Sequence, residues 1–281
     1  MEKKRPKRGA AAAAILLTLA GCAWYGNRTI EKETLTVRSA ALPAAFDGFR
    51  VAQITDLHGA EFGENNEYLL ALVRGAEPDI IALCGDVLHD DSRVEEFRPF
   101  LQALSAIAPT FFVTGNHEWG MAKADRAAFF KMLGDCGITR LENEYRVLKK
   151  GGEQIVLAGV DDPNGPAGQK TPAALVREIR AEMGENCYIL MLSHRNDEIE
   201  TWKALGVQTV LCGHAHGGIV RLPGLGPVFG THYELFPEYS AGLYVEGGTA
   251  MSVSRGLGAS RRLPIRIGNR PHLPVVVLKQ G

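Results

Sequence analysis

The sequence predicts an α/β fold for residues 32–281, and three features of the chain support this class. Apolar runs of strand length alternate with helix-length segments of 3.6-residue periodicity between residues 49 and 216. Five of these strand-like runs end in polar residues, most of them beside glycine. Beyond Gly217 the helical periodicity disappears, and short apolar runs separated by Gly and Pro predict a β-rich final portion.

The strands and helices are assigned from their apolar periodicity and from the residues that end them. Strands are expected at 32–39, 49–58, 79–86, 110–118, 154–162, 187–194 and 209–216, and short strands at 217–224, 241–248, 249–256 and 273–279. Helices are expected at 65–77, 93–107, 124–137 and 171–184. Gly137 and Gly184 end the last two helices, and Pro172 suits the first turn of the fourth.

The composition is that of a folded globular protein. The chain has 281 residues, of which 46% are hydrophobic and 22% are charged, and its formal net charge is −1. This apolar content argues against extensive disorder, and the near-zero charge predicts no binding to nucleic acid. No fixed-period repeat follows the N-terminal segment, so residues 32–281 are expected to form one domain.

Residues 1–22 have the pattern of an export segment. Five Lys or Arg residues lie among the first eight positions, and the uncharged run Ala10–Gly21 follows. This run is shorter than the ~20 residues of a membrane-spanning helix, which favours a signal peptide. Its end, Leu19-Ala20-Gly21-Cys22, resembles a bacterial lipobox and makes Cys22 a candidate for lipidation. The alternative is an uncleaved membrane anchor with Trp24 and Tyr25 at the interface.

Both alternatives place the following domain at the cell membrane, outside the cytoplasm. Residues 23–31 then form a tether that spans at most ~3.3–3.6 Å per residue and keeps the domain close to the bilayer. No Cys-x-x-Cys motif occurs, which argues against a zinc ribbon or a thioredoxin-like site. The remaining cysteines are expected to be buried apolar residues, although disulfides among them stay open in an exported protein.

The polar ends of five predicted strands carry groups that can bind metal ions. They are Asp56 and His58, Asp86, Asn116 and His117, His194, and the pair His214 and His216. Each alone is typical of a surface turn or a buried polar residue. In α/β sheets, however, ligands gather at the carboxyl ends of strands, and glycines at 85, 115 and 213 allow the sharp turns required. Together these residues therefore predict one shared site.

These residues carry a resemblance to a known family. The motifs Asp56-x-His58, Gly85-Asp86, Gly115-Asn116-His117-Glu118, Ser193-His194 and Gly213-His214-Ala215-His216 resemble those of calcineurin-like metallophosphoesterases in order and spacing. The finer match is to the membrane-associated bacterial branch of YkuE-like and YaeI-like phosphodiesterases. It is carried by GVDDP at 159–163, GHAHGG at 213–218, AGLY at 241–244 and VSRGLG at 253–258.

The resemblance implies a four-layer αββα sandwich, in which two mixed β-sheets are flanked by helices, with two metal ions at one sheet edge. Asp86 would bridge the ions, and each ion would have three further ligands. These are Asp56, His58 and His216 for one ion, and Asn116, His194 and His214 for the other. The donor set of oxygen and imidazole suits Mn²⁺, with Fe or Zn²⁺ as alternatives.

The implied reaction is hydrolysis of a phosphate monoester or diester by a hydroxide that bridges the two metals. Two divalent ions, two carboxylates and one hydroxide leave a charge of about +1, which attracts a phosphate ester. Asn116 matters in this count because its amide oxygen binds metal without adding negative charge. In the family, His117 faces the substrate and stabilises the developing charge or protonates the leaving oxygen, and a supporting role behind the ligands is its alternative.

Several residues carry less specific predictions. Asp161 can orient a ligand or cap the following loop, Asp162 beside it is a further candidate without an assigned role, and Arg255 can contact phosphate or brace its glycine-rich turn. His89 and His232 are candidates for the substrate groove, and His272 is expected to have no role in the site. Such relatives usually have an acidic residue three or four positions past Gly-Asp, where this chain has His89 and then Asp90.

Alternatives from other classes follow from the same residues. A catalytically silent, metal-binding envelope lipoprotein would keep the ligands but lack turnover, and a nuclease of the same fold is disfavoured by the near-neutral charge. Gly-x-Ser-x-Gly, P-loop and His-Glu-x-x-His motifs do not occur, so serine hydrolase, NTPase and zincin functions lack support. The short tether favours a lipid-linked phosphate as substrate. The oligomeric state stays open.

Overall fold

The computed structural model describes residues 25–89, 94–222, 224–230, 233–259 and 266–281, together with Gly9, Leu17 and Gly21. Cys22, Asp90, His232 and most of the predicted signal or anchor lie outside the described residues. Within the part of the chain that is described, no helix has the length and apolar character needed to cross a membrane.

The first sheet has six strands in the order β1-β14-β2-β3-β4-β5. Its members are β1 (Glu31–Ser39), β14 (His272–Gln280), β2 (Arg50–Ile54), β3 (Ile80–Cys84), β4 (Thr110–Val113) and β5 (Thr139–Arg140). Strands β2, β3 and β4 are parallel, whereas β14 pairs with β2 in the antiparallel direction. The carboxyl ends of β2, β3 and β4 therefore share one edge of the sheet.

The second sheet also has six strands, in the order β12-β13-β9-β8-β7-β6. Its members are β12 (Gly242–Glu246), β13 (Thr249–Val253), β9 (Thr209–Cys212), β8 (Ile189–Leu192), β7 (Glu153–Gly159) and β6 (Glu144–Lys150). The central strands β7, β8, β9 and β13 are parallel, and the outer strands are antiparallel. A separate hairpin joins β10 (Val220–Leu222) to β11 (Gly226–Phe229).

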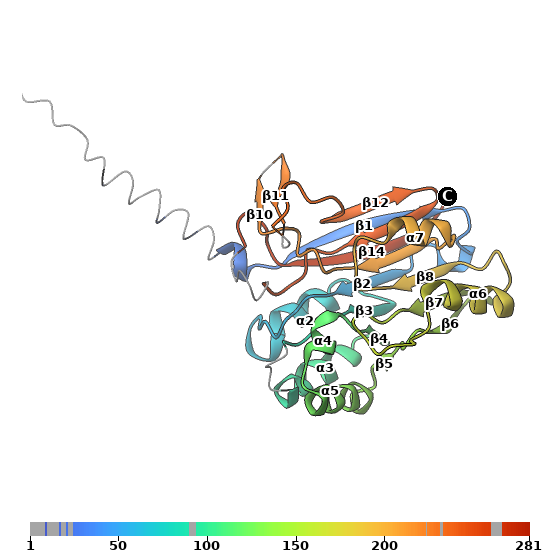
Figure 1. Cartoon of the computed structure of the whole chain (residues 1–281), viewed down its shortest axis with the longest axis horizontal. Helices are drawn as coiled ribbons and strands as arrows, with labels where there is room; N and C mark the ends of the chain where they lie inside the picture. The colour runs from blue at the N-terminus through green and yellow to red at the C-terminus, as the bar shows by residue number, and fades with distance from the viewer. Residues whose placement is uncertain are drawn as a thin grey trace, which may run out of the picture.

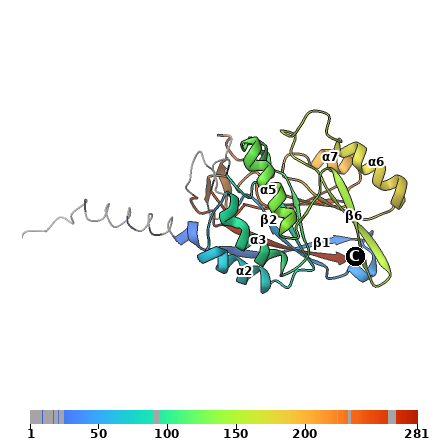
Figure 2. The same cartoon turned by 90° about the horizontal axis from the view of Figure 1, so that it is seen from below.

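The helices cover the outer faces of both sheets (Figures 1 and 2). They are α2 (Glu67–Arg74), α3 (Arg98–Ser105), α4 (Asn116–Gly120), α5 (Lys123–Asp135), α6 (Pro172–Met183) and α7 (Ile199–Ala204), with short 3-10 turns at Ala44–Phe46, Glu64–Asn66 and Val94–Phe97. Figure 2 shows α2, α3 and α5 gathered on one side, well apart from α6 and α7.

Three apolar cores follow from the alternation of side chains along the strands. On β3, Ile81 and Leu83 pack under α2, α3 and α5, whereas Ala82 and Cys84 face the second sheet. On β8, Leu190 and Leu192 face the first sheet, and Ile189 packs with α6 and α7. The predicted four-layer αββα sandwich of two mixed sheets is confirmed.

A buried polar link aligns the two sheets near their shared end. Gln53 on β2 is fully buried, and its Nε2 donates to the carbonyl oxygen of Cys212 on β9 at 2.7 Å. The Ser252 hydroxyl on β13 donates to Gln53 Oε1 at 2.7 Å. Because an unpaired buried amide is costly, these bonds favour one relative position of the sheets, and that position brings the ends of β2 and β9 together.

The structure differs from the sequence expectations mainly in short elements. The predicted strand at 110–118 ends at Val113, and its last residues form α4. Strands β5, β6 and β11 and helix α7 were not predicted. The four cysteines among the described residues are all free: Cys84, Cys136 and Cys212 are buried, and Cys187 is half-buried.

Candidate metal centre

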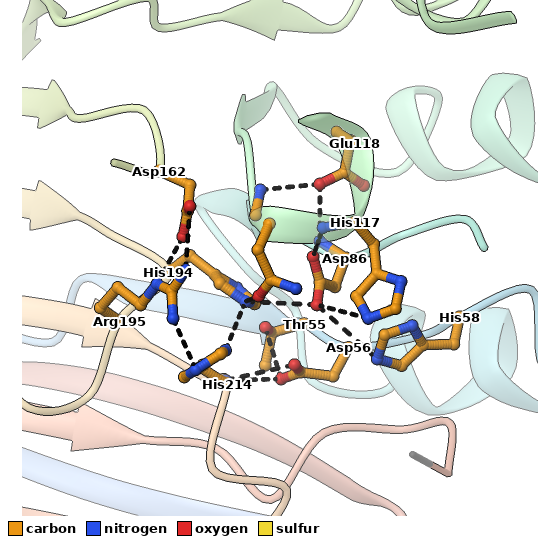
Figure 3. A network of polar contacts seen from close by, with 12 residues as sticks. Thr55, Asp56, His58, Asp86, His117, Glu118, Asp162, His194, Arg195 and His214 are labelled. Carbon is orange, nitrogen blue, oxygen red and sulfur yellow. Dashed lines mark hydrogen bonds and ion pairs between the residues drawn. The ribbon is translucent and has the colours of Figure 1, made fainter. Parts of the chain in front are cut away.

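Seven predicted ligands come together where the carboxyl ends of five strands meet. Asp56 and His58 follow β2, Asp86 follows β3, and Asn116 opens α4 directly after β4. His194 follows β8, and the pair His214 and His216 follows β9. Figure 3 shows side chains from both sheets directed toward one another around Asp86. The structure therefore places in one cluster the residues that the sequence separates by up to 160 positions.

Asp86 lies at the middle of the cluster. Its Oδ2 is 3.3 Å from His194 Nε2, 3.8 Å from His58 Nε2 and 4.0 Å from His117 Nε2. The Oδ1 of Asn116 lies 3.2 Å from the same His194 Nε2. Asp86 is buried, as are His58 and His194. A carboxylate with imidazoles on two sides is placed as a bridging ligand between two cations would be.

Two groups of ligand atoms flank Asp86. In the first, His216 Nε2 lies 3.6 Å from Asp56 Oδ1 and 3.2 Å from His58 Nε2. In the second, His214 Nδ1 lies 3.1 Å from His194 Nε2. Ligand atoms within 4.8 Å of one another form the sets Asp56, His58 and His216, and Asp86, His194 and His214.

The protonation chemistry of these donors fits divalent cations. Burial lowers the pKa of His58, His214 and His216, and that of His214 falls to about 2. Burial also opposes the charged form of His194, but the adjacent Asp86 carboxylate outweighs it and raises the pKa of His194 to about 10. The imidazoles of His58, His214 and His216 are thus in the neutral form that binds metal. The Asp86 carboxylate favours a positive charge beside it.

The backbone at the cluster is held in a strained conformation. Five of the predicted ligands have φ between 49° and 66°, a backbone region that residues other than glycine rarely adopt. They are Asp56, His58, Asp86, His214 and His216. Strain of this kind persists only where the surrounding structure enforces it, and it is common at functional sites. The sharp turns project the ligands inward from the strand ends.

Neighbouring glycines make room for these ligands. A Cβ added at Gly115 would lie 2.2 Å from Asp86 Oδ1, and one at Gly213 would lie 2.2 Å from Asp56 Oδ2. At Gly256, within the VSRGLG motif, a Cβ would lie 2.6 Å from that of Asp56. The glycine-rich motif therefore packs directly behind a predicted ligand.

Glu118 supports the cluster through the backbone, a role that was not predicted from the sequence. Its carboxylate is fully buried and accepts hydrogen bonds from the backbone N–H groups of Asp86, Val87 and Gly115 at 2.7–2.9 Å. It thereby fixes the turn after β3 against the start of α4. Burial, reinforced by Asp86, raises the pKa of Glu118 to about 7. In the sequence, the position of Glu118 three residues after Gly115 was the feature that could have indicated this role.

Arg195 is a second supporting residue that was not predicted from the sequence. Its Nε and Nη2 donate to the two carboxylate oxygens of Asp162 at 2.6 and 3.1 Å. Its Nη1 lies 2.9 Å from His214 Nε2, which must accept because a guanidinium only donates. Asp162 thus orients Arg195 beside His214, whose Nδ1 faces the cluster (Figure 3). A neutral imidazole that accepts at Nε2 carries its proton on Nδ1, so a metal ion at Nδ1 would require the Arg195 contact to open.

The less specific predictions have separate outcomes. Asp161 accepts from the Thr114 hydroxyl at 2.7 Å and so supports the turn before Asn116. Arg255 forms an ion pair with Glu31 at 3.0 Å and packs beside Gly217. His89 stacks on His58 with ring centroids 4.8 Å apart, and it lies with His58 and His117 in a third group of candidate ligands.

His272 has a structural position that the sequence did not indicate. It is buried at the start of β14, its Nε2 donates to Glu33 at 2.9 Å, and its Nδ1 accepts from the backbone N–H of Arg255 at 3.3 Å. It therefore connects β14, β1 and the glycine-rich turn.

Comparison with known proteins agrees with this geometry. Residues 49–218 match the family model described as calcineurin-like phosphoesterase. The chain is 28% identical to the uncharacterized metallophosphoesterase YkuE of Bacillus subtilis, over 89% of this chain and 86% of the relative. It is 30% identical to phosphodiesterase YaeI of Escherichia coli, over 82% of both chains.

Solved structures share the fold at low sequence identity. The sulfate thiohydrolase SoxB of Thermus thermophilus aligns with a TM-score of 0.52 and 13% identity, over 85% of this chain and 57% of that chain. Protein TT1561 of Thermus thermophilus aligns with a TM-score of 0.50 and 14% identity, over 75% and 90%. The family match and the relatives together show that the chain belongs to the calcineurin-like phosphoesterases, in the branch of YkuE and YaeI, and that it is a phosphoesterase.

Proposed function

We propose that the protein hydrolyses phosphodiesters, and phosphomonoesters less well, at a centre that holds two divalent metal ions close to a membrane. The observation that carries this proposal is the position of Asp86 between two groups of imidazoles, each with a further oxygen donor. The relative named phosphodiesterase YaeI supports the diester as the preferred class.

The predicted ligands fall into two sets according to their positions around Asp86. Asp56, His58 and His216 would hold one ion, Asn116, His194 and His214 would hold the second, and Asp86 would contact both. When bound, the two ions supply a Lewis acid for the phosphoryl oxygens and lower the pKa of a coordinated water. The donor set of oxygen and imidazole favours Mn²⁺, with Fe or Zn²⁺ as alternatives.

His117 is proposed as the residue that serves the leaving group. Its side chain is 26% exposed, whereas Asp56, His58, Asp86, His194 and His216 are buried, and its Nε2 lies 4.0 Å from Asp86 Oδ2. An imidazole at the open side of the cluster can donate a proton to the departing oxygen or stabilise its charge. Acid catalysis of this kind contributes ~10²–10⁴-fold to a rate.

Attachment to the membrane rests on the N-terminal sequence. The basic segment, the apolar run Ala10–Gly21 and the lipobox-like end at Cys22 support either a lipid anchor or an uncleaved helix. We therefore propose that the catalytic domain lies outside the cytoplasm at the cell membrane, where lipid-linked phosphates are within reach of the tether.

The test is hydrolysis of bis-p-nitrophenyl phosphate and of p-nitrophenyl phosphate by the purified full chain, with and without added Mn²⁺. We expect Mn²⁺-stimulated release of nitrophenol, faster from the diester, and none from the Asp86→Ala variant. A metal-loaded protein that cleaves neither ester would reject the proposal in favour of a silent metal-binding lipoprotein.

A further inference from the structure

Large apolar side chains are exposed in one region directly after the last predicted ligands. Of the ten exposed large hydrophobic residues in the described part of the chain, six lie here, each between 46% and 69% exposed. They are Leu222, Leu225, Tyr233, Leu235, Phe236 and Ile267. Contiguous exposed apolar residues mark surfaces that contact a partner or a membrane.

Backbone hydrogen bonds join these six residues into one surface. The strands β10 and β11 form an antiparallel hairpin, and Leu225 closes its turn by donating to the carbonyl oxygen of Leu222. Phe229 on β11 pairs with Leu235, and Val220 on β10 pairs with Ile267. The hairpin, residues 233–236 and Ile267 therefore form a continuous unit, called here the apolar rim.

The apolar rim lies beside the segment that leads to the N-terminus. Asn27 exchanges two hydrogen bonds with the backbone of Arg266, at 3.2 and 3.1 Å, next to Ile267. Figure 1 shows the β10–β11 hairpin projecting on the side of the molecule where the N-terminal segment enters. The uncharged run Ala10–Gly21 precedes this segment, so a chain held in a bilayer by that run brings the apolar rim to the same bilayer.

The rim is also connected to the candidate metal centre. The Nδ2 of Asn269 donates to the carbonyl oxygens of His216 and Gly218 at 2.7 and 2.6 Å, which links the ligand loop to the base of the rim. A groove of ≈ 460 Å³ runs from Arg195 and His214 to Glu234 and Tyr239, and Glu234 directly precedes the exposed residues Leu235 and Phe236 in the chain. A headgroup at the membrane surface can enter this groove.

We infer that the apolar rim rests on the surface of a phospholipid bilayer and presents the candidate metal centre to phosphate esters of lipid headgroups. This inference names a substrate class for the proposed function and rests on it. A second copy of the chain would also bury apolar surface, but it would not explain why the rim adjoins the segment that follows the apolar run.

The test is photo-cross-linking of the full chain reconstituted in vesicles of phosphatidylethanolamine and phosphatidylglycerol. A p-benzoylphenylalanine replaces Leu225 or Phe236 on the rim, or Val245 as an exposed control on β12, which runs away from the hairpin in Figure 1. We expect several-fold more lipid adduct at positions 225 and 236 than at 245. Equal lipid adduct at all three positions, or adducts that join two copies of the chain, would overturn the inference.

A second measurement separates this inference from the proposed function. In the Leu225→Asp, Phe236→Asp double variant, cross-linking to lipid from position 235 should fall several-fold, with Val245→Asp as the matched control. Hydrolysis of soluble bis-p-nitrophenyl phosphate should stay at the wild-type rate, because neither residue contacts the cluster. Lipid adducts at the rim of a protein that cleaves no ester would support the membrane face and reject only the proposed hydrolysis.

Discussion

At the scale of single residues, the charge of the cluster decides what it can bind. Asp56 and Asp86 supply its two carboxylates, whereas Asn116 contributes a neutral amide oxygen 3.2 Å from His194 Nε2. An Asn116→Asp variant should retain metal, because a carboxylate also binds it, but should cancel the positive charge that attracts the ester. We expect at least a roughly tenfold loss of kcat/KM, about 1.4 kcal/mol. Metal analysis beside steady-state kinetics checks this, and wild-type turnover at full metal content would contradict it.

The backbone N–H and the imidazole of His117 have separate functions, so a substitution can remove the imidazole and keep the N–H. Its N–H donates to Asp86 Oδ1 at 2.8 Å, and this bond survives removal of the imidazole. His117→Ala should therefore keep metal content and lower kcat by ~10²–10⁴-fold if the side chain acts as a general acid. Loss of metal together with the rate would show instead that the imidazole has a structural role.

Arg195 is expected to act through His214 rather than on the substrate. Removing the guanidinium in Arg195→Ala frees the ring of His214 and leaves the buried Asp162 carboxylate without its cation. A guanidinium beside Nε2 favours the proton on Nδ1, the ring atom that faces the cluster, so its loss should leave metal affinity equal to or higher than that of the wild type. Mn²⁺ titration checks this, and weaker binding by the variant would contradict it. Arg146→Ala, which removes a surface arginine paired with Glu144, should leave affinity unchanged.

At the scale of the elements, the turns that follow the strands determine where the predicted ligands lie. A Cβ at Gly213 would lie 2.2 Å from both Asp56 Oδ2 and Thr55 Oγ1. Gly213→Ala should therefore displace a ligand, abolish activity and destabilise the fold by about 1–3 kcal/mol, as overpacking does. Gly134→Ala is the control, because this helical position in α5 has open space around it. It should raise the unfolding free energy by ~0.5–1 kcal/mol. Equal urea midpoints for the two variants would contradict this account.

The elements themselves were predictable where their periodicity is long and regular. Helix α6 begins after Thr171, which caps it by accepting from the backbone N–H of Ala174, and it ends at Gly184 with φ of 90°. By contrast, α4 has five residues and α7 has six, too few to establish a helical period. Strand β6 carries charged and polar residues on an outer strand, so its sequence lacks a clear apolar run.

At the scale of the whole molecule, the ends of the chain are held together by a pair of titratable groups. His272 on β14 donates to Glu33 on β1 at 2.9 Å, and β1 and β14 run parallel along their full length. Burial lowers the pKa of His272 from 6.5 despite this bond, and the bond to His272 lowers the pKa of Glu33 from 4.5. Both groups therefore bind protons more readily in the unfolded chain than in the folded protein.

Acidification should consequently destabilise the fold. As the pH falls below about 6.5, the unfolded chain gains a proton at His272 that the folded protein does not, and Glu33 extends the effect below about 4.5. His272→Gln removes the first contribution. Its unfolding free energy should depend less on pH than that of the wild type between about pH 7.5 and 5.5, by up to about 1.4 kcal/mol per pH unit. If the unfolding free energies of His272→Gln and of the wild type, measured in urea, changed equally with pH, the assignment of this effect to His272 would be contradicted.

The sequence by itself determined the α/β class, the family and the set of candidate metal ligands, because apolar periodicity and the spacing of Asp, Asn and His after strands are local properties of the chain. Only the tertiary structure decided which supporting residues surround those groups. Glu118 and Arg195 act through backbone N–H groups and a ring nitrogen that lie far away in sequence, and Gln53 aligns two sheets across a buried interface. Such contacts depend on which surfaces face each other after folding, and no local pattern encodes that. The same holds for the apolar rim, whose residues become one surface only when Ile267 pairs beside β10 and Leu235 beside β11.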